Sequence, residues 1–478
     1  MQNGFDSPAA VNRCSQPPQY VRPSNSPVVD LPAELLLIIF KLVYEQFAKE
    51  SSDVVHPHPI RDPAQFPYPI AAVCRRWASI LSMVPEYWTS LVAYLDDDYP
   101  IDIASQLAWS RGLSFELTIT KRDKSVKATP SHEAWLAHAI IATSLPHLHR
   151  CTALRLSVAR SSSLPHFGQT FYGNASLLEE LVLACRLDDG VSNVVWPPVR
   201  GKGITCPKLR TLTVNASNFM QMALSIPSWK NTPLTSLTIA NFSSTKRSGV
   251  TFPLPIFLHT IAQLPNLSCL RVVDVDLSPL DGPRPIVTLG QLQTVYLCKI
   301  SATALYDIVS SLPTVDHLSI SKCALPSSFD SEHLPNAYHL SLDGIREITA
   351  PFQSAITFIR NIVFGVLTLT NCPGLAGEVC RLLGECLDED NSTLVFPSLH
   401  GVTFENSPNI DPHDILKALD QRGIWYDNHG LTNQLEPYDE WRIQEVEVLH
   451  SCPPVESPFI DYLLDQHDIH VNWTPIEG

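Results

Sequence analysis

The sequence has little glycine and little charge. It contains 19 glycines in 478 residues, and none of them falls in the spacing of a Walker loop or a dinucleotide-binding loop, which cradle phosphates. The G-x-S-x-G and H-E-x-x-H patterns of hydrolases and zinc proteases are also absent. Charged residues make up 17% of the chain, below the usual ~25%. The sequence therefore predicts a protein that is not an enzyme and that needs no cofactor or metal.

Cysteine and apolar runs give no sign of secretion or of a membrane. The 12 cysteines include no C-x-x-C pair, and a chain of this length has no need of disulfide staples. No apolar run approaches the ~20 residues that cross a bilayer, and residues 1–14 lack the order of a signal peptide. The net charge of −15 argues against nucleic acid, which requires clustered Lys and Arg. We expect an intracellular protein, cytoplasmic or nuclear, with no membrane or nucleic-acid partner.

Two apolar segments near the N-terminus have helical spacing. In residues 30–40, DLPAELLLIIF, Asp30 occupies an N-cap position and Pro32 a first-turn position. The apolar girdle that follows is wider than a surface helix needs, so we expect another chain to cover part of it. Residues 70–88, IAAVCRRWASILSMVPEYW, predict a second helix that Pro85 ends. Its apolar face comprises Ala71, Cys74, Trp77, Ile80 and Leu81, opposite Arg75 and Arg76.

Together these segments resemble an F-box. The motifs that carry the resemblance are Leu31-Pro32 with Glu34, the run Val73-Cys74-Arg75-Arg76-Trp77, and Pro85-x-x-Trp88. The stretch 41–69 is longer than the compact turn of this family, and its proline-rich part does not favour a helix. We interpret it as a loop insertion that leaves the helices intact. The alternative is an altered packing of the three helices that weakens partner binding.

The resemblance implies an adaptor in a ubiquitin ligase. F-box modules bind the Skp-type linker, and through it the cullin, of a Skp–cullin–F-box ligase, while the rest of the chain captures a protein substrate. The residues expected to contact the linker are Leu31, Pro32, Leu35, Ile38 and Ile39. The residues expected to form the core of the module are Val73, Cys74, Trp77 and Trp88. The chain is similar in style to the expanded F-box families of mushroom-forming fungi.

A second pattern recurs through most of the remaining chain. An apolar residue is followed three and five positions later by two others, as in the L-x-x-L-x-L of a leucine-rich repeat. Ten windows match, and they begin at Cys151, Leu178, Leu209, Leu234, Leu267, Leu292, Val315, Ala337, Phe364 and Leu399. A weaker match at Leu117 and Ile119 precedes them, and another at Ile443 follows. The Asn that normally follows the L-x-L is mostly absent, with Asn371 as its one candidate.

The repeat pattern also predicts the two faces of a sheet. Residues marked L point into the core, and the residues between them point out of the concave face. Ser and Thr dominate that outward set, but they suit exposed strand positions in general, so no single hydroxyl indicates a function. Tyr and Arg often carry interface energy. The preferred anchors for a substrate lie on successive or near-successive strands and are Arg271, Tyr296, His317 and His339.

We therefore predict an α/β fold, with a small N-terminal helical F-box module followed by an irregular leucine-rich-repeat solenoid. The solenoid has a parallel concave sheet and a helical or irregular convex side. The expected boundaries are a disordered tail at 1–29, the helical module at 30–95 with a proline-rich insertion at about 48–69, the solenoid at 96–450, and a C-terminal cap or tail at 451–478.

Two hypotheses for the function remain open. In the first, the chain is a ubiquitin-ligase adaptor. In the second, it is a leucine-rich-repeat scaffold whose F-box-like segment only caps the open end of the solenoid core, with no connection to ubiquitination. The exposure of Leu35, Ile38 and Ile39 discriminates between them, because an adaptor needs these side chains available whereas a cap buries them.

Overall fold

The chain divides into two compact units, Met1–Tyr87 and Trp88–Gly478. The computed structural model describes residues 31–52, 66–96, 103–122, 129–190, 203–225, 233–243, 251–278, 289–325, 334–345, 353–386, 394–408, 410–428, 443–450 and 469–474. The predicted tail at 1–29 and most of the predicted insertion lie outside these residues.

The first unit is built on one long helix. α1 (Ala33–Ser52) begins after Pro32, whose carbonyl accepts hydrogen bonds from the N–H groups of Leu35 and Leu36 at 3.1 and 3.2 Å. A first-turn proline suits this position because the missing N–H has no partner there in any helix. α2 (Tyr68–Ala71) and α3 (Arg75–Leu81) follow, and the 3-10 helix η1 (Pro85–Trp88) ends at the first residue of the second unit. α1 ends at Ser52, a few residues into the insertion predicted at about 48–69.

The single helical face predicted from Ala71 to Leu81 is wrong. α2 ends at Ala71, and Cys74 is extended, with φ −162° and ψ 162°. The N–H of Val73 closes a turn onto the carbonyl of Ile70 at 3.2 Å. Because the backbone leaves the helical path at this turn, the 3.6-residue spacing does not run across it.

Aromatic contacts hold the first unit together. Phe40 of α1 lies edge-on to Trp77 of α3, with the ring centroids 5.2 Å apart. Farther along α1, Tyr44 packs with Phe66 and Tyr87, and the three centroid distances lie between 4.7 and 5.5 Å. Such pairs contribute about 0.5–1.5 kcal/mol each beyond the area that they bury. One face of α1 is therefore committed to contacts within its own unit.

The second unit contains a 14-stranded sheet in which each strand pairs with the next, and all of these pairs are parallel. The strands in order are β1 (Ser90–Tyr94), β2 (Phe115–Thr120), β3 (Cys151–Arg160), β5 (Glu180–Leu187), β7 (Thr211–Asn215), β8 (Ser236–Phe242), β10 (Cys269–Val275), β12 (Thr294–Cys298), β13 (Val315–Ser321), β14 (Ala337–Asp343), β15 (Phe364–Thr370), β16 (Gly401–Glu405), β17 (Glu445–Leu449) and β18 (His470–Thr474).

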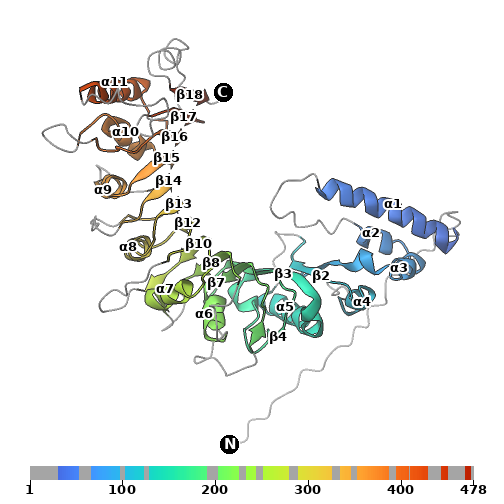
Figure 1. Cartoon of the computed structure of the whole chain (residues 1–478). Helices are drawn as coiled ribbons and strands as arrows, with labels where there is room; N and C mark the ends of the chain where they lie inside the picture. The colour runs from blue at the N-terminus through green and yellow to red at the C-terminus, as the bar shows by residue number, and fades with distance from the viewer. Residues whose placement is uncertain are drawn as a thin grey trace, which may run out of the picture. The chain divides into compact units, whose positions relative to one another are not determined.

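Helices lie between many of these strands. They are α4 (Ile103–Trp109), α5 (Pro130–Ser144), η2 (Leu145–Arg150), η3 (Ser161–Ser163), α6 (Ala216–Ser225), α7 (Leu254–Ala262), α8 (Ala302–Val309), α9 (Gln353–Asn361), α10 (Pro373–Leu382) and α11 (Pro412–Asn428). Two short pairs, β4 (Gly173–Asn174) with β6 (Ile204–Thr205) and β9 (Phe252–Pro253) with β11 (Leu277–Ser278), complete the unit. Helices α6–α11 lie along one side of the sheet (Figure 1).

The ten predicted windows all coincide with strands, from β3 to β16. The weaker matches at Leu117 and Ile443 lead to β2 and β17, and the strand pattern extends one strand farther at each end, to β1 and β18. The boundary predicted after residue 95 is therefore too late, because β1 already pairs with β2 in this sheet. The segment predicted as a C-terminal cap or tail contributes β18 to the sheet.

The burial of the strands follows the predicted alternation. Leu270 and Leu318 are fully buried, and Leu270, Val295 and Leu318 are Cα neighbours across β10, β12 and β13. The residues between the apolar positions are more exposed. We call the side of the sheet that carries these alternate side chains the open face.

Eight successive strands, β8 and β10 and then β12–β17, turn at one register. In each of these strands, the residue two positions after the third apolar residue of the three-and-five pattern has a φ between 49° and 58°. These residues are Asn241, Asp274, Lys299, Lys322, Gly344, Asn371, Asn406 and His450. Their N–H groups continue the inter-strand ladder, for example from Lys322 to the carbonyl of Asp343 at 2.7 Å. Lysine has no intrinsic preference for this left-handed region. The sheet therefore imposes the conformation.

The position after this turn accounts for the missing Asn of the repeat. Buried Cys372 occupies it, and its sulfur lies 3.4 Å from the backbone nitrogen of Ile345 and 3.7 Å from the carbonyl oxygen of Leu342. Cys323 bridges two segments in the same way. Burial raises the pKa of both thiols to about 11, so they stay protonated. The prediction that Asn371 fills this place is wrong, because its side chain is exposed.

Truncating the inward row tests the register. Replacing Leu270 or Leu318 with Ala leaves a cavity between fully buried neighbours, and we expect the free energy of unfolding to fall by about 2–5 kcal/mol. Ile256 is exposed on α7 and is the matched control, whose change to Ala should stay within ~0.5 kcal/mol. Chemical denaturation measures all three. Silent changes at both leucines would show that the strand register is wrong.

Candidate functional site

The first candidate surface is an apolar stripe on α1. Leu35, Ile38, Ile39 and Leu42 are spaced at i, i+3, i+4 and i+7, which places them on one face of the helix. Their exposed fractions are 47%, 56%, 42% and 62%. A contiguous exposed row of large aliphatic side chains is typical of a binding surface. We call these four residues the α1 stripe.

The α1 stripe is exposed because the rest of the unit uses another face of the helix. Leu36 and Phe40 are buried, and Phe40 contacts Trp77 of α3. The start of α1 is fixed by Arg76, whose Nη2 donates a hydrogen bond to the carbonyl of Leu31 at 2.6 Å. Leu31 itself is half-buried and Pro32 is exposed. The five predicted linker contacts therefore lie at or near one side of a helix that α3 holds in place.

Two of the four predicted core residues do not belong to the core of the first unit. Val73 is 53% exposed because it lies in the turn between α2 and α3. Trp88 is buried, but it belongs to the second unit, where its ring lies 4.5 Å from that of Trp109. Trp77 and Cys74 are half-buried within the first unit. The predictions for Val73 and Trp88 are therefore wrong.

The second candidate surface lies in the middle of the open face. Arg271 and Tyr296 are Cα partners on β10 and β12, and the guanidinium carbon of Arg271 lies 4.3 Å from the centre of the Tyr296 ring. A cation over an aromatic face is stabilised by about 0.5–1 kcal/mol at an exposed site. The tyrosine thus orients the guanidinium. No carboxylate in the described part of the chain forms an ion pair with Arg271.

Two histidines lie on the next two strands. His317 and His339 are Cα partners on β13 and β14, and their ring centroids are 5.3 Å apart. Nε2 of His339 lies 2.8 Å from Oγ1 of Thr368. Burial lowers the pKa of His339, and the positive charge that His317 can acquire lowers it further. The structure therefore brings the four predicted anchors together as two contacting pairs on four successive strands.

Arg271 belongs to a row of outward residues that crosses the sheet. Successive Cα partners define this row, which we call the Arg271 column: Arg155, Val182, Thr213, Thr238, Arg271, Tyr296, Ser319, Ser341, Thr368, Thr403, Glu447 and Asn472. From Val182 to Thr403 the column contains no acidic side chain. Its centre is therefore cationic and rich in hydroxyl groups.

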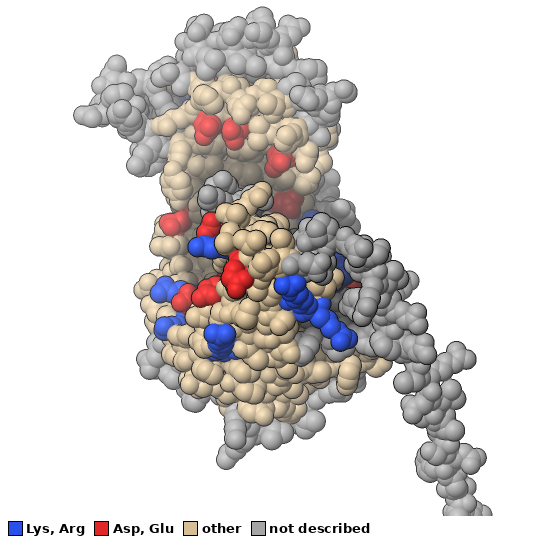
Figure 2. Space-filling view, turned by 90° about the vertical axis from the view of Figure 1, so that its right-hand side faces the viewer, with Lys and Arg blue, Asp and Glu red and all other residues tan. Residues whose placement is uncertain are grey.

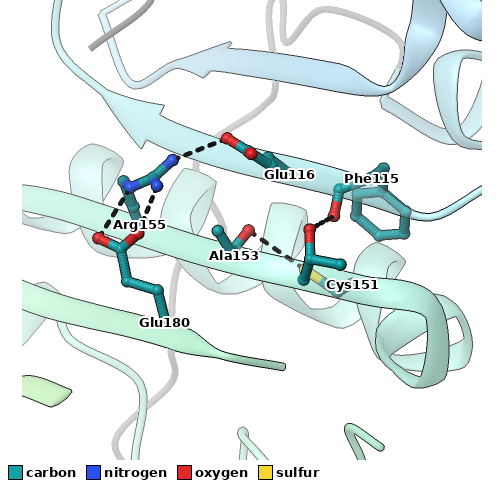
Figure 3. A network of polar contacts seen from close by, with 7 residues as sticks. Phe115, Glu116, Cys151, Ala153, Arg155 and Glu180 are labelled. Carbon is teal, nitrogen blue, oxygen red and sulfur yellow. Dashed lines mark hydrogen bonds and ion pairs between the residues drawn. The ribbon is translucent and has the colours of Figure 1, made fainter. Parts of the chain in front are cut away.

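The other arginine of the column is neutralised by its neighbours. Nη1 of Arg155 donates to Glu116 of β2 at 3.1 Å, and Nε donates to Glu180 of β5 at 3.0 Å. A second bond runs from Nη2 to Glu180. Figure 3 shows the guanidinium between the two carboxylates. Arg155 therefore joins three adjacent strands and offers little to a partner.

The C-terminal end of the open face is acidic. Glu447 accepts hydrogen bonds from Oγ1 of Thr403 at 3.1 Å and from Nδ2 of Asn472 at 3.5 Å. Glu405, one strand earlier, accepts from Oγ1 of Thr370 at 3.1 Å. In Figure 2 acidic side chains are spread over the upper part of the second unit, where Figure 1 places the C-terminal strands. The described residues contribute no cation to Glu447 or Glu405.

No protein-family model matches the chain, and no curated protein matches it either. None of the helices in the described ranges combines the length and apolarity needed to cross a bilayer. Within those ranges, no three His, Cys, Asp or Glu side chains come together as metal ligands. The two surfaces are therefore the features of the chain that bear on its function.

Sequence reasoning missed the contrast between Arg155 and Arg271. The repeat pattern placed both on the outward set, together with Glu180. It did not bring Glu116 to the same point, because β2 matches the repeat weakly and a bulge shifts its pairing with β3 between Phe115 and Glu116. A signal was present in the alternation of Glu116 with buried Phe115 and Leu117 along β2.

Removing Arg155 should leave two facing carboxylates. We expect Arg155→Met to lower the free energy of unfolding at neutral pH by about 1–2 kcal/mol, since hydrogen bonds to charged groups contribute this much when partly exposed. Adding Glu180→Gln should restore part of the loss by removing one carboxylate. Urea denaturation of the single and double variants measures both effects. A double variant less stable than the single one would contradict this account.

The pKa of His339 predicts a pH dependence. A folded-state pKa below the unfolded value of 6.5 means that the unfolded chain binds more protons at low pH. The contribution of neutral His339 to the free energy of unfolding is complete above pH 6.5 and is lost as the pH falls below that value. When the pH is lowered from 7.5 to about 5, the melting temperature of His339→Asn should therefore fall less than that of the wild type. His413→Asn, at an exposed residue of α11, is the control and should behave like the wild type.

Proposed function

We propose that the protein is the substrate-recognition adaptor of a Skp–cullin–F-box ubiquitin ligase. In this proposal the first unit is an F-box-like module that binds the Skp-type linker through the α1 stripe, together with Leu31 and Pro32. The second unit is an irregular leucine-rich-repeat solenoid whose open face binds a protein substrate. The chain itself performs no chemistry, because it brings substrate and ubiquitin carrier together.

The observation that carries this proposal is the exposure of the α1 stripe. Burying one large aliphatic side chain contributes about 1.5–3 kcal/mol. Four partly exposed side chains on one helix can supply a large share of the free energy that a complex needs to offset the entropy cost of association. A helix that lays its apolar face into a groove is an established mode of recognition, and α1 has such a face available.

The first unit does not itself bury the side chains that discriminate between the adaptor and capping hypotheses. A cap contributes by burying its apolar side chains against the end of a repeat array. Within the first unit, Leu35, Ile38 and Ile39 are 47%, 56% and 42% exposed. The residues of α1 that are buried, Leu36 and Phe40, are used within the first unit.

The architecture of the second unit suits the presentation of a substrate. Its sheet is continuous from Ser90 to Thr474, and each strand is hydrogen-bonded to its neighbours. Arrays of this kind are rigid along the stacking direction and bind partners on an extended face. The oriented Arg271 and Tyr296 pair lies within that face, and Arg and Tyr are enriched where interfaces concentrate their energy.

Capture of a Skp-type linker tests the adaptor function. The full chain is co-purified with the linker as the wild type, as Ile38→Asp and as Ile424→Asp. Ile38 and Ile424 have nearly equal exposure, 56% and 59%, but Ile424 lies on α11 of the second unit. We expect Ile38→Asp to lower the affinity at least tenfold, because a charge replaces a buried aliphatic side chain. Ile424→Asp should change nothing.

The double variant Leu31→Ala/Pro32→Ala provides a second measurement. It should weaken capture while the free energy of unfolding changes by no more than about 1 kcal/mol. The bond from Arg76 is retained, because it ends on the backbone carbonyl of residue 31. A folded wild-type chain that captures no linker, or an Ile38→Asp variant that captures it fully, would overturn the adaptor function.

A further inference from the structure

We infer that the open face binds an extended segment of a protein partner that places a carboxylate side chain against Arg271 and a basic side chain toward Glu447. This deepens the proposed function by specifying the chemistry of the substrate segment, and it rests on that function only for calling the partner a substrate. The inference stands on the geometry of the Arg271 column.

At the cationic end, Arg271 is an oriented donor that has no acidic partner among the residues that the structure describes. Arg271 is exposed, and its contact with another described side chain is the stacking over Tyr296 at 4.3 Å. The aromatic ring satisfies one face of the guanidinium but leaves its N–H groups available at the edge. A guanidinium edge matches the two oxygens of a carboxylate. By contrast, Arg155 in the same column already contacts Glu116 and Glu180, so it does not compete for the segment.

The charge on the column fits a carboxylate better than a phosphate group. Between Val182 and Thr403, Arg271 is the permanently charged residue of the column. A phosphorylated side chain carries about −1.5 to −2 at neutral pH and is usually held by several cations. One guanidinium balances one carboxylate.

The middle of the column can bind the backbone of the segment. Ser319 and Ser341 follow Tyr296 on the next two strands and are half-buried. Their hydroxyl groups form no hydrogen bond to other described residues, so they are free to pair with peptide N–H or C=O groups. Small side chains here also allow a backbone to approach the sheet closely.

The acidic end sets the direction and the length of the segment. Glu447 lies in the same column as Arg271, six strand-to-strand steps away. Steps of about 4.8 Å separate the two residues by roughly 29 Å along the sheet, which corresponds to about nine residues of extended chain at ~3.3 Å each. Glu447 is oriented by Thr403 and Asn472, which are both neutral. A segment with its acidic and basic residues in the opposite order would have to run in the reverse direction.

The experiment selects binding segments without knowledge of the natural partner. A displayed library of randomised fourteen-residue segments is selected on the full chain as the wild type, as Arg271→Glu, as Glu447→Lys and as Arg360→Glu. Arg360 is exposed on α9 and is the control for a change of charge away from the open face. Thermal melting establishes that each variant is folded before selection.

The expected result is a charge pattern that follows the column. Segments selected on the wild type and on Arg360→Glu should carry an acidic and a basic residue about nine positions apart. Each selected segment should bind Arg271→Ala about tenfold more weakly than the wild type, since a charged hydrogen-bonded pair is lost. Arg271→Glu should select a basic residue in place of the acidic one, and Glu447→Lys should do the converse.

Several results would overturn the inference. Selection of no segment, of segments without charge, or of the same segments on Arg271→Glu as on the wild type would each exclude the column as the site. A synthetic segment with phosphoserine in place of its acidic residue should bind more weakly than the selected segment. Tighter binding would show that Arg271 recognises a phosphate group and not a carboxylate. Linker capture through α1 is measured separately. If the chain selects segments but does not capture the linker, the ligase role is excluded and this inference stands. If the chain captures the linker but selects no segment, this inference is excluded and the ligase role stands.

Discussion

The hydrogen-bonded register of the parallel sheet is the constraint on which the second unit depends. Side chains alternate between the two faces with a period of two, so a shift of one residue would expose a whole row of core side chains. Leu270, Val295 and Leu318 are neighbours on the buried side. The same pairing places the residues that follow each of them next to one another on the open face. The core and the candidate binding surface therefore have a single origin.

In the first unit, the short helix α3 can cover only part of the surface of α1. α3 has seven residues, and a helix so short covers one face of α1 and no more. Leu36 and Phe40 occupy that face, and the α1 stripe stays outside it. An apolar row in water costs free energy, and its burial by a partner recovers that cost. The packing that stabilises the unit and the surface that we propose for the linker are thus two faces of one helix.

The two arginines of the Arg271 column show how neighbours decide the role of a residue. Both project from the open face of the same sheet in the same register. Arg155 has a glutamate on each adjacent strand and becomes a clamp between strands. Arg271 has Thr238 and Tyr296 as its Cα partners and is oriented, but no carboxylate of the described segments neutralises it. One arginine stabilises the sheet, and the other remains available for binding.

Local spacing by itself determined much of this protein. The apolar three-and-five pattern places strands β3–β16 because it is a property of a few consecutive residues, and the run after Pro32 predicts the start of α1 for the same reason. The pattern fails at β18 because Asp468 stands three positions before Val471, where the pattern requires an apolar residue. Tertiary structure decided what spacing cannot encode. It assigned Trp88 to the second unit and exposed Val73 in a turn. Among the described residues, it gave Arg155 two acids but Arg271 none. The physical reason is that burial and charge pairing depend on which distant segments meet, whereas helical and strand periodicity depend only on neighbours along the chain.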